Sequence, residues 1–361
     1  MARETRMKIP GVLLLLLVAG AALLANASPS PAAQGKPPGF YGVVLANTPS
    51  PQDWDTMEQA GVGSVRLAIP WQTLQPSGHG PIDWRSIDEV VGPAAGHGIA
   101  VLPFLGGTPQ GLASDPTTLP IRTAGQREAW ASFLRAAVSR YGPNGDFWSD
   151  PYTPYLPIRT WQIWNEQNTP FFARPVSPKA YDRLLNLSSL SIRAVDPGAD
   201  VLIGGMLGRP AAKPPEAYPA DQFVDKMYSA GSIRGSFSGV GLHPYSEKVP
   251  EVGVQAKAMR KVFARHHDRR KTLAITEITW GAGPRGSGWL EEGPAGQAQR
   301  LTQMYRMFYA HRNSWRVTGV YWFSWRSHAS VPQCVFCRTS GLLNLSGNET
   351  PALHAFESLA R

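Results

Sequence analysis

Residues 159–206 read RTWQIWNEQNTPFFARPVSPKAYDRLLNLSSLSIRAVDPGADVLIGGM, a stretch that alternates between two kinds of pattern. Its two ends, 159–164 and 200–206, are short apolar runs with β-branched or aromatic residues, which are typical of buried strands. Between them, residues 178–195 have helical periodicity, with Ser177 as a candidate N-cap and Asp196-Pro197-Gly198 as a stop. The stretch therefore predicts a strand–helix–strand unit.

The same alternation recurs along the chain from residue 40 onward. Strands are predicted at 40–45, 64–70, 99–105, 159–164, 200–206, 238–243, 272–276 and 318–324. Helices are predicted at 52–60, 84–95, 125–141, 178–195, 221–230, 252–267, 295–312 and 351–359. This pattern matches a single α/β domain, a (β/α)8 TIM barrel. The alternative is an open doubly wound sheet. That fold typically has a glycine-rich phosphate-binding turn after its first strand, whereas residues 45–48 of this chain read Leu-Ala-Asn-Thr and contain no glycine.

The composition excludes several classes of protein. Only 17% of the 361 residues are charged, against about 25% in soluble proteins, which excludes a disordered acidic or basic tail. The formal charge is +9, but no run of lysine and arginine is dense enough to predict nucleic-acid binding. The best candidate, 265–271, is better interpreted as a solvated helix end.

The N-terminus is typical of a secretory signal. Residues 1–27 combine a basic start, an apolar run over 11–25 and the small-x-small sequence Ala25-Asn26-Ala27, which predicts cleavage after Ala27. The apolar run is shorter than the roughly 20 residues of a membrane span, so an uncleaved anchor is the less favoured alternative. We therefore expect a secreted monomer without a membrane span, with a Pro/Ala-rich linker at 28–38 and a barrel domain at 39–361.

The chain has two cysteines, Cys334 and Cys337. In an exported protein this spacing favours a short-loop disulfide. A redox site is disfavoured because no strand precedes the pair and no helix opens after it, and a zinc site would need two more ligands. The loop 327–339 that carries the pair should lie over the barrel mouth after the eighth strand and stiffen its rim.

Acidic side chains follow two of the predicted strands, at the barrel end where active sites of this fold lie. Asn165 and Glu166 end the fourth strand, and Glu277 ends the seventh. A carboxylate among tryptophan and isoleucine residues is costly to bury without a partner or a function. Either glutamate alone could cap the next helix, but two carboxyl groups facing each other across a mouth are what glycoside cleavage requires.

Two segments carry a family resemblance. Trp-Gln-Ile-Trp-Asn-Glu at 161–166 and Ile-Thr-Glu-Ile-Thr-Trp at 275–280 resemble the catalytic strands of clan A glycoside hydrolases, which are retaining (β/α)8 enzymes. Family 39 and related bacterial exopolysaccharide glycosidases are the most similar. The resemblance implies that Glu166 is the acid/base, that Glu277 is the nucleophile and that Asn165 binds the sugar 2-hydroxyl. It implies no metal and no cofactor.

The same resemblance implies further site residues. Arg66, at the end of the second strand, matches the arginine that supports the nucleophile, and an arginine flanked by apolar residues needs a carboxylate partner. His243 and Tyr245, after the sixth strand, match a hydrogen-bonding pair near the nucleophile. The alternative for His243 is a core histidine.

Three tryptophans at strand ends are candidate sugar-binding surfaces. Trp280 follows the seventh strand, and Trp322 or Trp325, at the end of the eighth, would be the sugar platform, with core packing as the alternative. Two positions depart from the clan pattern: Gln167 stands where proline usually follows the acid/base glutamate, and Gln162 stands where relatives often have an acidic residue.

These observations predict a secreted retaining glycosidase. The alternatives are a non-catalytic carbohydrate-binding barrel and a metal-dependent hydrolase. A metal-dependent hydrolase would need His266 and His267 as ligands. The sequence argues against this, because adjacent side chains on a helix point about 100° apart and the pair lies far from the end of any predicted strand. The sugar, and whether cleavage is internal or terminal, stay open.

Overall fold

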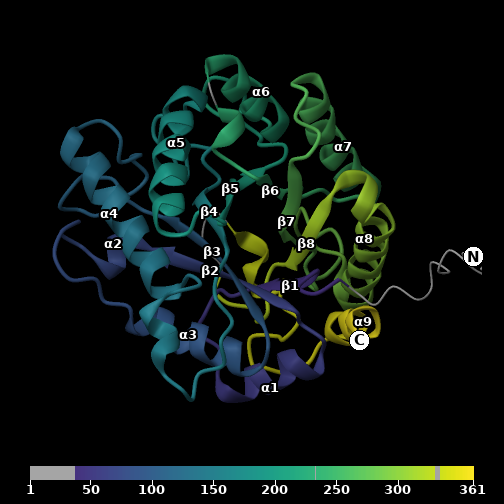
Figure 1. The fold of residues 1–361 in the computed structure, drawn as a ribbon. Helices are drawn as coiled ribbons and strands as arrows, with labels where there is room; N and C mark the ends of the chain where they lie inside the picture. Colours follow the sequence, from purple (N-terminus) through teal and green to yellow (C-terminus); the bar gives the residue numbers. More distant parts are fainter. Residues whose placement is uncertain (1–36, 232, 330–333) are drawn as a thin grey trace, which may run out of the picture. The chain divides into compact units, whose positions relative to one another are not determined.

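The computed structural model describes residues 37–361 except for residues 232 and 330–333. Within it, strands β1 to β8 form a closed parallel barrel in chain order, with β1 paired to β8 (Figure 1). The strands are β1 Tyr41–Val44, β2 Ser64–Pro70, β3 Ala100–Gly106, β4 Thr160–Asn165, β5 Asp200–Leu207, β6 Gly239–His243, β7 Thr272–Ile278 and β8 Val317–Trp322. The predicted TIM barrel is confirmed, and closure of the sheet excludes the doubly wound alternative.

The helices form a ring outside the strands (Figure 1). They are α1 Pro51–Gln59, α2 Trp71–Leu74, α3 Arg85–Gly96, α4 Ala124–Tyr141, α5 Pro178–Val195, α6 Ala220–Ala230, α7 Val249–Arg265, α8 Gly293–Trp315 and α9 Pro351–Ala360. Short 3-10 turns lie at η2 Asp146–Ser149, η3 Ile233–Gly235 and η4 Val335–Arg338. The short helix α2 was not predicted, and α8 is longer than predicted at both ends.

Local sequence explains where several helices begin. Ser177 accepts a hydrogen bond from the Ala180 amide at 3.2 Å, so the predicted N-cap of α5 is confirmed. Ser50 and Thr123 cap α1 and α4 in the same way, each in a reciprocal capping box. These caps satisfy amide groups that the first turn of a helix leaves without a partner.

The inside of the barrel has an apolar layer. Val44, Leu102, Leu202 and Ala274 come from the odd-numbered strands, and they form a small cluster with Tyr321 of β8. Layers contributed by alternate strands are characteristic of this fold.

The remaining sequence predictions concern the chain termini. Pro37–Arg361 forms one compact unit. The predicted signal at 1–27 and most of the linker at 28–38 lie outside the described residues. In the described part of the chain, no helix combines the length and the apolar character needed to cross a membrane.

Candidate active site

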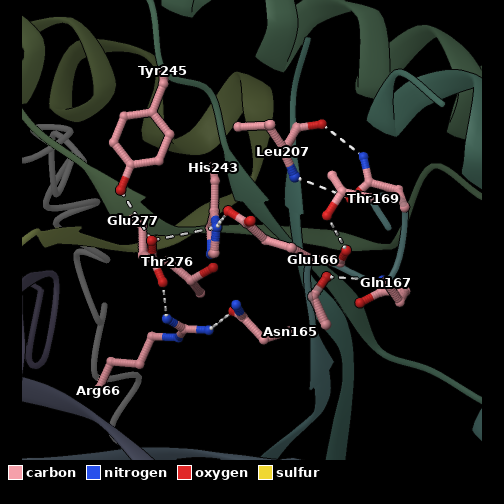
Figure 2. A network of polar contacts seen from close by, with 12 residues as sticks. Arg66, Asn165, Glu166, Gln167, Thr169, Leu207, His243, Tyr245, Thr276 and Glu277 are labelled. Carbon is pink, nitrogen blue, oxygen red and sulfur yellow. Dashed lines mark hydrogen bonds and ion pairs between the residues drawn. The ribbon is translucent and has the colours of Figure 1, made fainter. Parts of the chain in front are cut away.

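Glu166 and Glu277 meet at the mouth of the barrel, brought together from β4 and β7 (Figure 2). One oxygen of each carboxyl group and a ring nitrogen of His243 all lie within 4.8 Å of one another. Each glutamate side chain is only 13% exposed. The structure therefore places two nearly buried carboxyl groups face to face where a substrate would enter.

Arg66 organises one side of this pair. Its side chain is fully buried, and its Nη1 donates to Glu277 Oε1 at 2.5 Å (Figure 2). The other nitrogens donate to Asn165 Oδ1 at 2.7 Å and to Gln162 Oε1 at 2.8 Å. The guanidinium also lies 4.1 Å from the ring centroid of Phe104. This bonding holds Glu277 in place, since charge-assisted hydrogen bonds from a guanidinium are short and strong.

Tyr245 and His243 complete the cluster from the end of β6. Tyr245 Oη donates to Glu277 Oε2 at 2.9 Å, so both oxygens of that carboxylate have partners. His243 Nδ1 lies 2.8 Å from Glu166 Oε1 and 3.5 Å from Glu277 Oε2. The sequence placed His243 near the nucleophile, whereas in the structure its shorter contact is with Glu166.

The two glutamates have different electrostatic surroundings. Burial raises the pKa of Glu166 from 4.5 to about 7, and the more distant Arg66 opposes this only in part. Burial lowers the pKa of His243 to about 3, so the imidazole is neutral at working pH and leaves Glu166 without a cationic partner. Thus one carboxyl group can hold a proton near neutrality while the other is paired with a guanidinium.

Glycines make room for this cluster inside the barrel. A Cβ atom at Gly205 would lie 2.0 Å from His243 Nε2, and one at Gly241 would lie 2.1 Å from Gln162 Nε2. Both strands must therefore be free of a side chain at these positions for His243 and Gln162 to fit. Gln162 also donates to Thr276 Oγ1 at 3.4 Å, which connects β4 to β7 below the carboxyl groups.

The backbone turns sharply around Asn165. Trp164 and Glu166 both have left-handed φ values, 69° and 42°, which are uncommon for residues with side chains. The turn is fixed by hydrogen bonds: the Glu166 amide donates to the Gly205 carbonyl at 2.7 Å, and the Thr169 hydroxyl donates to the Glu166 carbonyl at 3.0 Å. Strained backbone of this kind collects at functional sites when its surroundings hold it in place.

Gln167, the departure from the clan pattern, takes part in the same structure. It is fully buried, and its amide donates to the Gly204 carbonyl at 3.2 Å. The next residue, Asn168, donates to the carbonyls of Leu207 and Tyr218, both at 2.8 Å. The sequence analysis did not predict these supporting roles, although the run of polar residues Gln167-Asn168-Thr169 directly after Glu166 was a usable signal.

The three candidate sugar-binding tryptophans are in the core, which corrects the prediction. Trp280 and Trp322 are fully buried and Trp325 is 2% exposed. Their indole nitrogens donate to the Glu247 carbonyl, the Ser340 carbonyl and Asp53 Oδ1, respectively. Adjacent strand residues point to opposite faces. It is therefore Phe323, one residue after Trp322, that packs against the cluster inside the barrel.

The predicted disulfide joins Cys334 and Cys337, with Cα atoms 5.4 Å apart. The bridged segment carries Phe336 to the mouth, where its ring lies 5.6 Å from the Tyr245 ring and 6.2 Å from the Phe323 ring. The described part of the loop thus lies against the site, as expected.

A metal ion fits this cluster poorly, although Glu166, His243 and Glu277 are close enough to share one. Arg66 and Tyr245 already occupy both oxygens of Glu277, and the buried guanidinium would repel a cation beside it. The pair His266-His267 is not a ligand set either, because His266 bonds to Asp225 at 2.8 Å and stacks on Tyr228.

The raised pKa of Glu166 predicts a pH-dependent effect of removing its charge. The unfolded chain has the ordinary pKa of 4.5 and the folded one about 7, so stability falls as pH rises through this window. Glu166→Gln should therefore raise the free energy of unfolding by up to roughly 3 kcal/mol at pH 8 and by far less at pH 4.5. Urea unfolding at both pH values measures this; an equal effect at both would contradict it. Glu128→Gln, on the exposed face of α4, is the control.

Comparison with solved structures shows which enzymes share this fold. A family 39 glycoside hydrolase from the gut symbiont Bacteroides cellulosilyticus WH2 matches with a TM-score of 0.67 at 19% identity, covering 90% of this chain and 64% of that one. A glucosidase from Croceicoccus marinus matches with a TM-score of 0.66 at 13% identity, and the match covers 90% of this chain and 69% of the glucosidase. A monomeric beta-xylosidase from Caulobacter crescentus CB15 matches with a TM-score of 0.63 at 19% identity, and the match covers 89% of this chain and 67% of the xylosidase.

No protein-family model matches the sequence, and no curated protein aligns with it. The structural likeness therefore concerns the fold: an eight-stranded parallel barrel like those of family 39 and other clan A glycoside hydrolases. The resemblance inferred from 161–166 and 275–280 is confirmed at this level. The chain spans 64% of the length of the Bacteroides enzyme, so the activity of that whole protein is not transferred with the fold.

Proposed function

We propose that this protein is a retaining glycoside hydrolase that cleaves O-glycosidic bonds of oligo- or polysaccharides. The observation that carries the proposal is the close approach of two carboxyl groups in unlike surroundings, Glu166 beside a neutral histidine and Glu277 beside a buried arginine. A glycosidase needs this difference, because one carboxyl group must donate a proton while the other stays charged.

Each residue then has a role in double displacement. Glu166 protonates the leaving oxygen as Glu277 attacks the anomeric carbon, so that the glycosidic bond breaks and a sugar ester forms on Glu277. Glu166, now ionised, takes a proton from water, which attacks the anomeric carbon and releases Glu277. Arg66 and Tyr245 position Glu277, and Asn165, held by Arg66, is available to the sugar 2-hydroxyl.

The spacing of the carboxyl groups supports retention over inversion. Retaining enzymes hold the two groups about 5–5.5 Å apart, whereas inverting enzymes need about 6.5–9.5 Å to place a water between them. One oxygen of Glu166 and one of Glu277 lie within 4.8 Å of each other, which is closer to the retaining than to the inverting spacing.

A screen of the purified mature protein tests the proposal. The substrates are nitrophenyl glycosides of xylose, glucose, mannose and arabinofuranose together with native polysaccharides, with product masses and anomeric configuration read out. Hydrolysis with retained configuration is expected for at least one sugar. Inverted product would overturn the mechanism, and binding without any product would instead favour a carbohydrate-binding barrel.

The raised pKa of Glu166 predicts the pH dependence of catalysis. Because Glu166 must be protonated to act as the acid, kcat/KM should fall on the alkaline side with an apparent pKa near 7, the value that burial gives this group. His243, with its pKa lowered to about 3, should add no step between pH 5 and 8. In Glu166→Gln the alkaline limb should disappear. If kcat/KM of that variant still falls at alkaline pH, the fall must come from the titration of another group.

We also propose that the protein is exported. The basic, apolar and small-x-small pattern of residues 1–27 supports this, as does the Cys334–Cys337 disulfide, because such bonds persist in oxidising compartments. The N-terminal sequence of protein recovered from the culture medium should begin at Ser28; retention of the whole chain in the cytoplasm would refute export.

A further inference from the structure

A cavity of about 370 Å³ lies beside the carboxyl ends of β2, β3 and β4, apart from the two glutamates. Its walls come from the ends of these strands, from Gln72 of α2, and from two loops, one between β3 and α4 and one between β4 and α5. The side chains that matter here are Phe104, Thr117, Asn165, Phe171 and Phe172. We refer to it as the Phe171 cavity.

The Phe171 cavity adjoins the catalytic cluster directly. Asn165 lines the cavity and also accepts a hydrogen bond from Arg66 at 2.7 Å. Phe104 lines it as well, and its ring centroid lies 4.1 Å from the Arg66 guanidinium. Two residues thus separate the arginine that holds Glu277 from the cavity, so a chain bound at the carboxyl groups would reach the cavity with its neighbouring unit.

Two aromatic rings stand exposed in the wall. Phe171 is 56% exposed and Phe172 is 36% exposed, and neither belongs to the hydrophobic core of the described residues. Large apolar side chains exposed next to a site are typical of ligand-binding surfaces, and an aromatic ring suits the C–H face of a sugar. Both rings therefore leave a large part of their surface free for a ligand in the cavity.

The loop that carries these rings is held in place before any ligand binds. Trp164 Nε1 donates to the Phe172 carbonyl at 2.7 Å, and the Arg174 amide donates to the Thr117 carbonyl of the facing loop at 3.3 Å. Ala173, between them, is fully buried. A binding surface fixed in this way loses little conformational entropy on binding.

The described lining of the Phe171 cavity carries no formal charge. Its polar groups are the amides of Gln72 and Asn165 and the hydroxyl of Thr117. A charged ligand would lose its hydration there without a counter-charge, whereas hydroxyl groups can pair with amides. The cavity on the other side of the mouth, by contrast, is lined by Arg209, Glu247 and Glu251. The chemistry of the Phe171 cavity thus selects an uncharged sugar ring.

We propose that the Phe171 cavity binds a second, neutral sugar ring next to the ring on which the carboxyl groups act. This inference rests on the proposed glycosidase function. It assigns the substrate class: an oligo- or polysaccharide with at least two neutral residues at the mouth, bound in part by stacking on Phe171 and Phe172.

The test compares one-ring and multi-ring substrates of the sugar that the nitrophenyl screen selects among xylose, glucose, mannose and arabinofuranose. The glycosyl fluoride has one ring and a minimal leaving group, and the trisaccharide extends into the cavity. In the double variant Phe171→Ala/Phe172→Ala, kcat/KM for the trisaccharide should fall about 10- to 100-fold, while the fluoride is hydrolysed at the wild-type rate. Phe171→Tyr, which keeps the ring, should retain trisaccharide activity.

Tyr152→Ala is the matched control, since Tyr152 is 92% exposed in the segment that precedes β4, at the opposite end of the barrel. Tyr152→Ala should change neither the hydrolysis of the trisaccharide nor that of the glycosyl fluoride. Equal losses on both substrates, or no loss on the trisaccharide, would overturn the second ring site while leaving the glycosidase proposal intact. A wild-type protein that hydrolyses none of the glycosides and polysaccharides in the screen would overturn the glycosidase proposal and, with it, this inference. Unfolding temperatures show whether each variant is folded.

Discussion

Replacement of Glu277 by glutamine should reduce turnover of every substrate by on the order of 10⁴-fold or more, as removal of a covalent nucleophile does in other enzymes. An amide has nearly the same shape and still accepts a hydrogen bond from Arg66, but it cannot form the sugar ester. The loss should therefore appear in kcat for activated aryl glycosides and natural substrates alike, because both pass through the same intermediate.

The fold must be checked in this variant because Arg66 is fully buried and loses its charged partner. Breaking a buried ion pair is costly, so Glu277→Gln should unfold at a lower temperature than the wild type. Glu128→Gln, whose carboxylate is 74% exposed on α4, removes a glutamate without touching the site and should leave turnover unchanged. Glu277→Gln protein that is folded and still turns over at the wild-type rate would exclude Glu277 as the nucleophile.

The intermediate itself offers a second readout. A 2-fluoro sugar with an activated leaving group slows both steps because fluorine disfavours positive charge at the anomeric carbon, and the sugar ester on the wild-type enzyme should then accumulate. Peptide mass spectrometry should find the label on Glu277. A label on Glu166, or on neither glutamate, would require a different assignment of roles.

Replacement of Glu166 by alanine should have an effect that depends on the leaving group. A general acid contributes about 10²- to 10⁴-fold, so substrates with poor leaving groups should lose that much in kcat/KM. Dinitrophenyl glycosides need little protonation, and their first step should proceed nearly as in the wild type. The second step then becomes slow, because no base remains to activate water, and a burst of phenol should precede slow turnover.

Azide distinguishes this role from simple damage to the site. The space left by the side chain admits azide, which needs no base; it attacks the anomeric carbon as the bond to Glu277 breaks, giving a glycosyl azide of retained configuration. Azide should accelerate Glu166→Ala and leave Glu277→Gln unaffected. Absence of rescue in a folded Glu166→Ala protein, or loss of activity that is equal for all leaving groups, would argue against Glu166 as the acid/base.

Much of the site could be predicted because its main residues follow strands at one end of a barrel. Once eight strands and helices alternate, every strand must end at the same mouth, so Asn165, Glu166, His243 and Glu277 could be assigned to one place from their positions alone. Arg66 does not end its strand as predicted: it is the third residue of β2, and its side chain extends to Glu277. The disulfide was predictable for a similar reason, because Cys334 and Cys337 are near neighbours in the chain.

The assignment of Trp322 as the sugar platform was wrong because it depended on a single residue of register. Trp322 and Phe323 are adjacent, yet Trp322 packs outside the strands and Phe323 inside them. A shift of one residue exchanges the two faces of a strand. Apolar patterning gives no help in a parallel barrel, where both faces of each strand are buried.

The sequence by itself determined the barrel and the strand ends at which two glutamates meet, because strand and helix periodicity are local properties and closure of the ring follows from their order. The family resemblance already paired Arg66 with Glu277, whereas only the tertiary structure decided that the shorter contact of His243 is with Glu166 and that Phe171 and Phe172 line a cavity next to Asn165. These contacts join residues far apart in the chain, Arg66 to Glu277 and Glu166 to His243. Their geometry depends on side-chain packing in three dimensions, and so does the burial that raises the pKa of Glu166, on which the proposed chemistry rests.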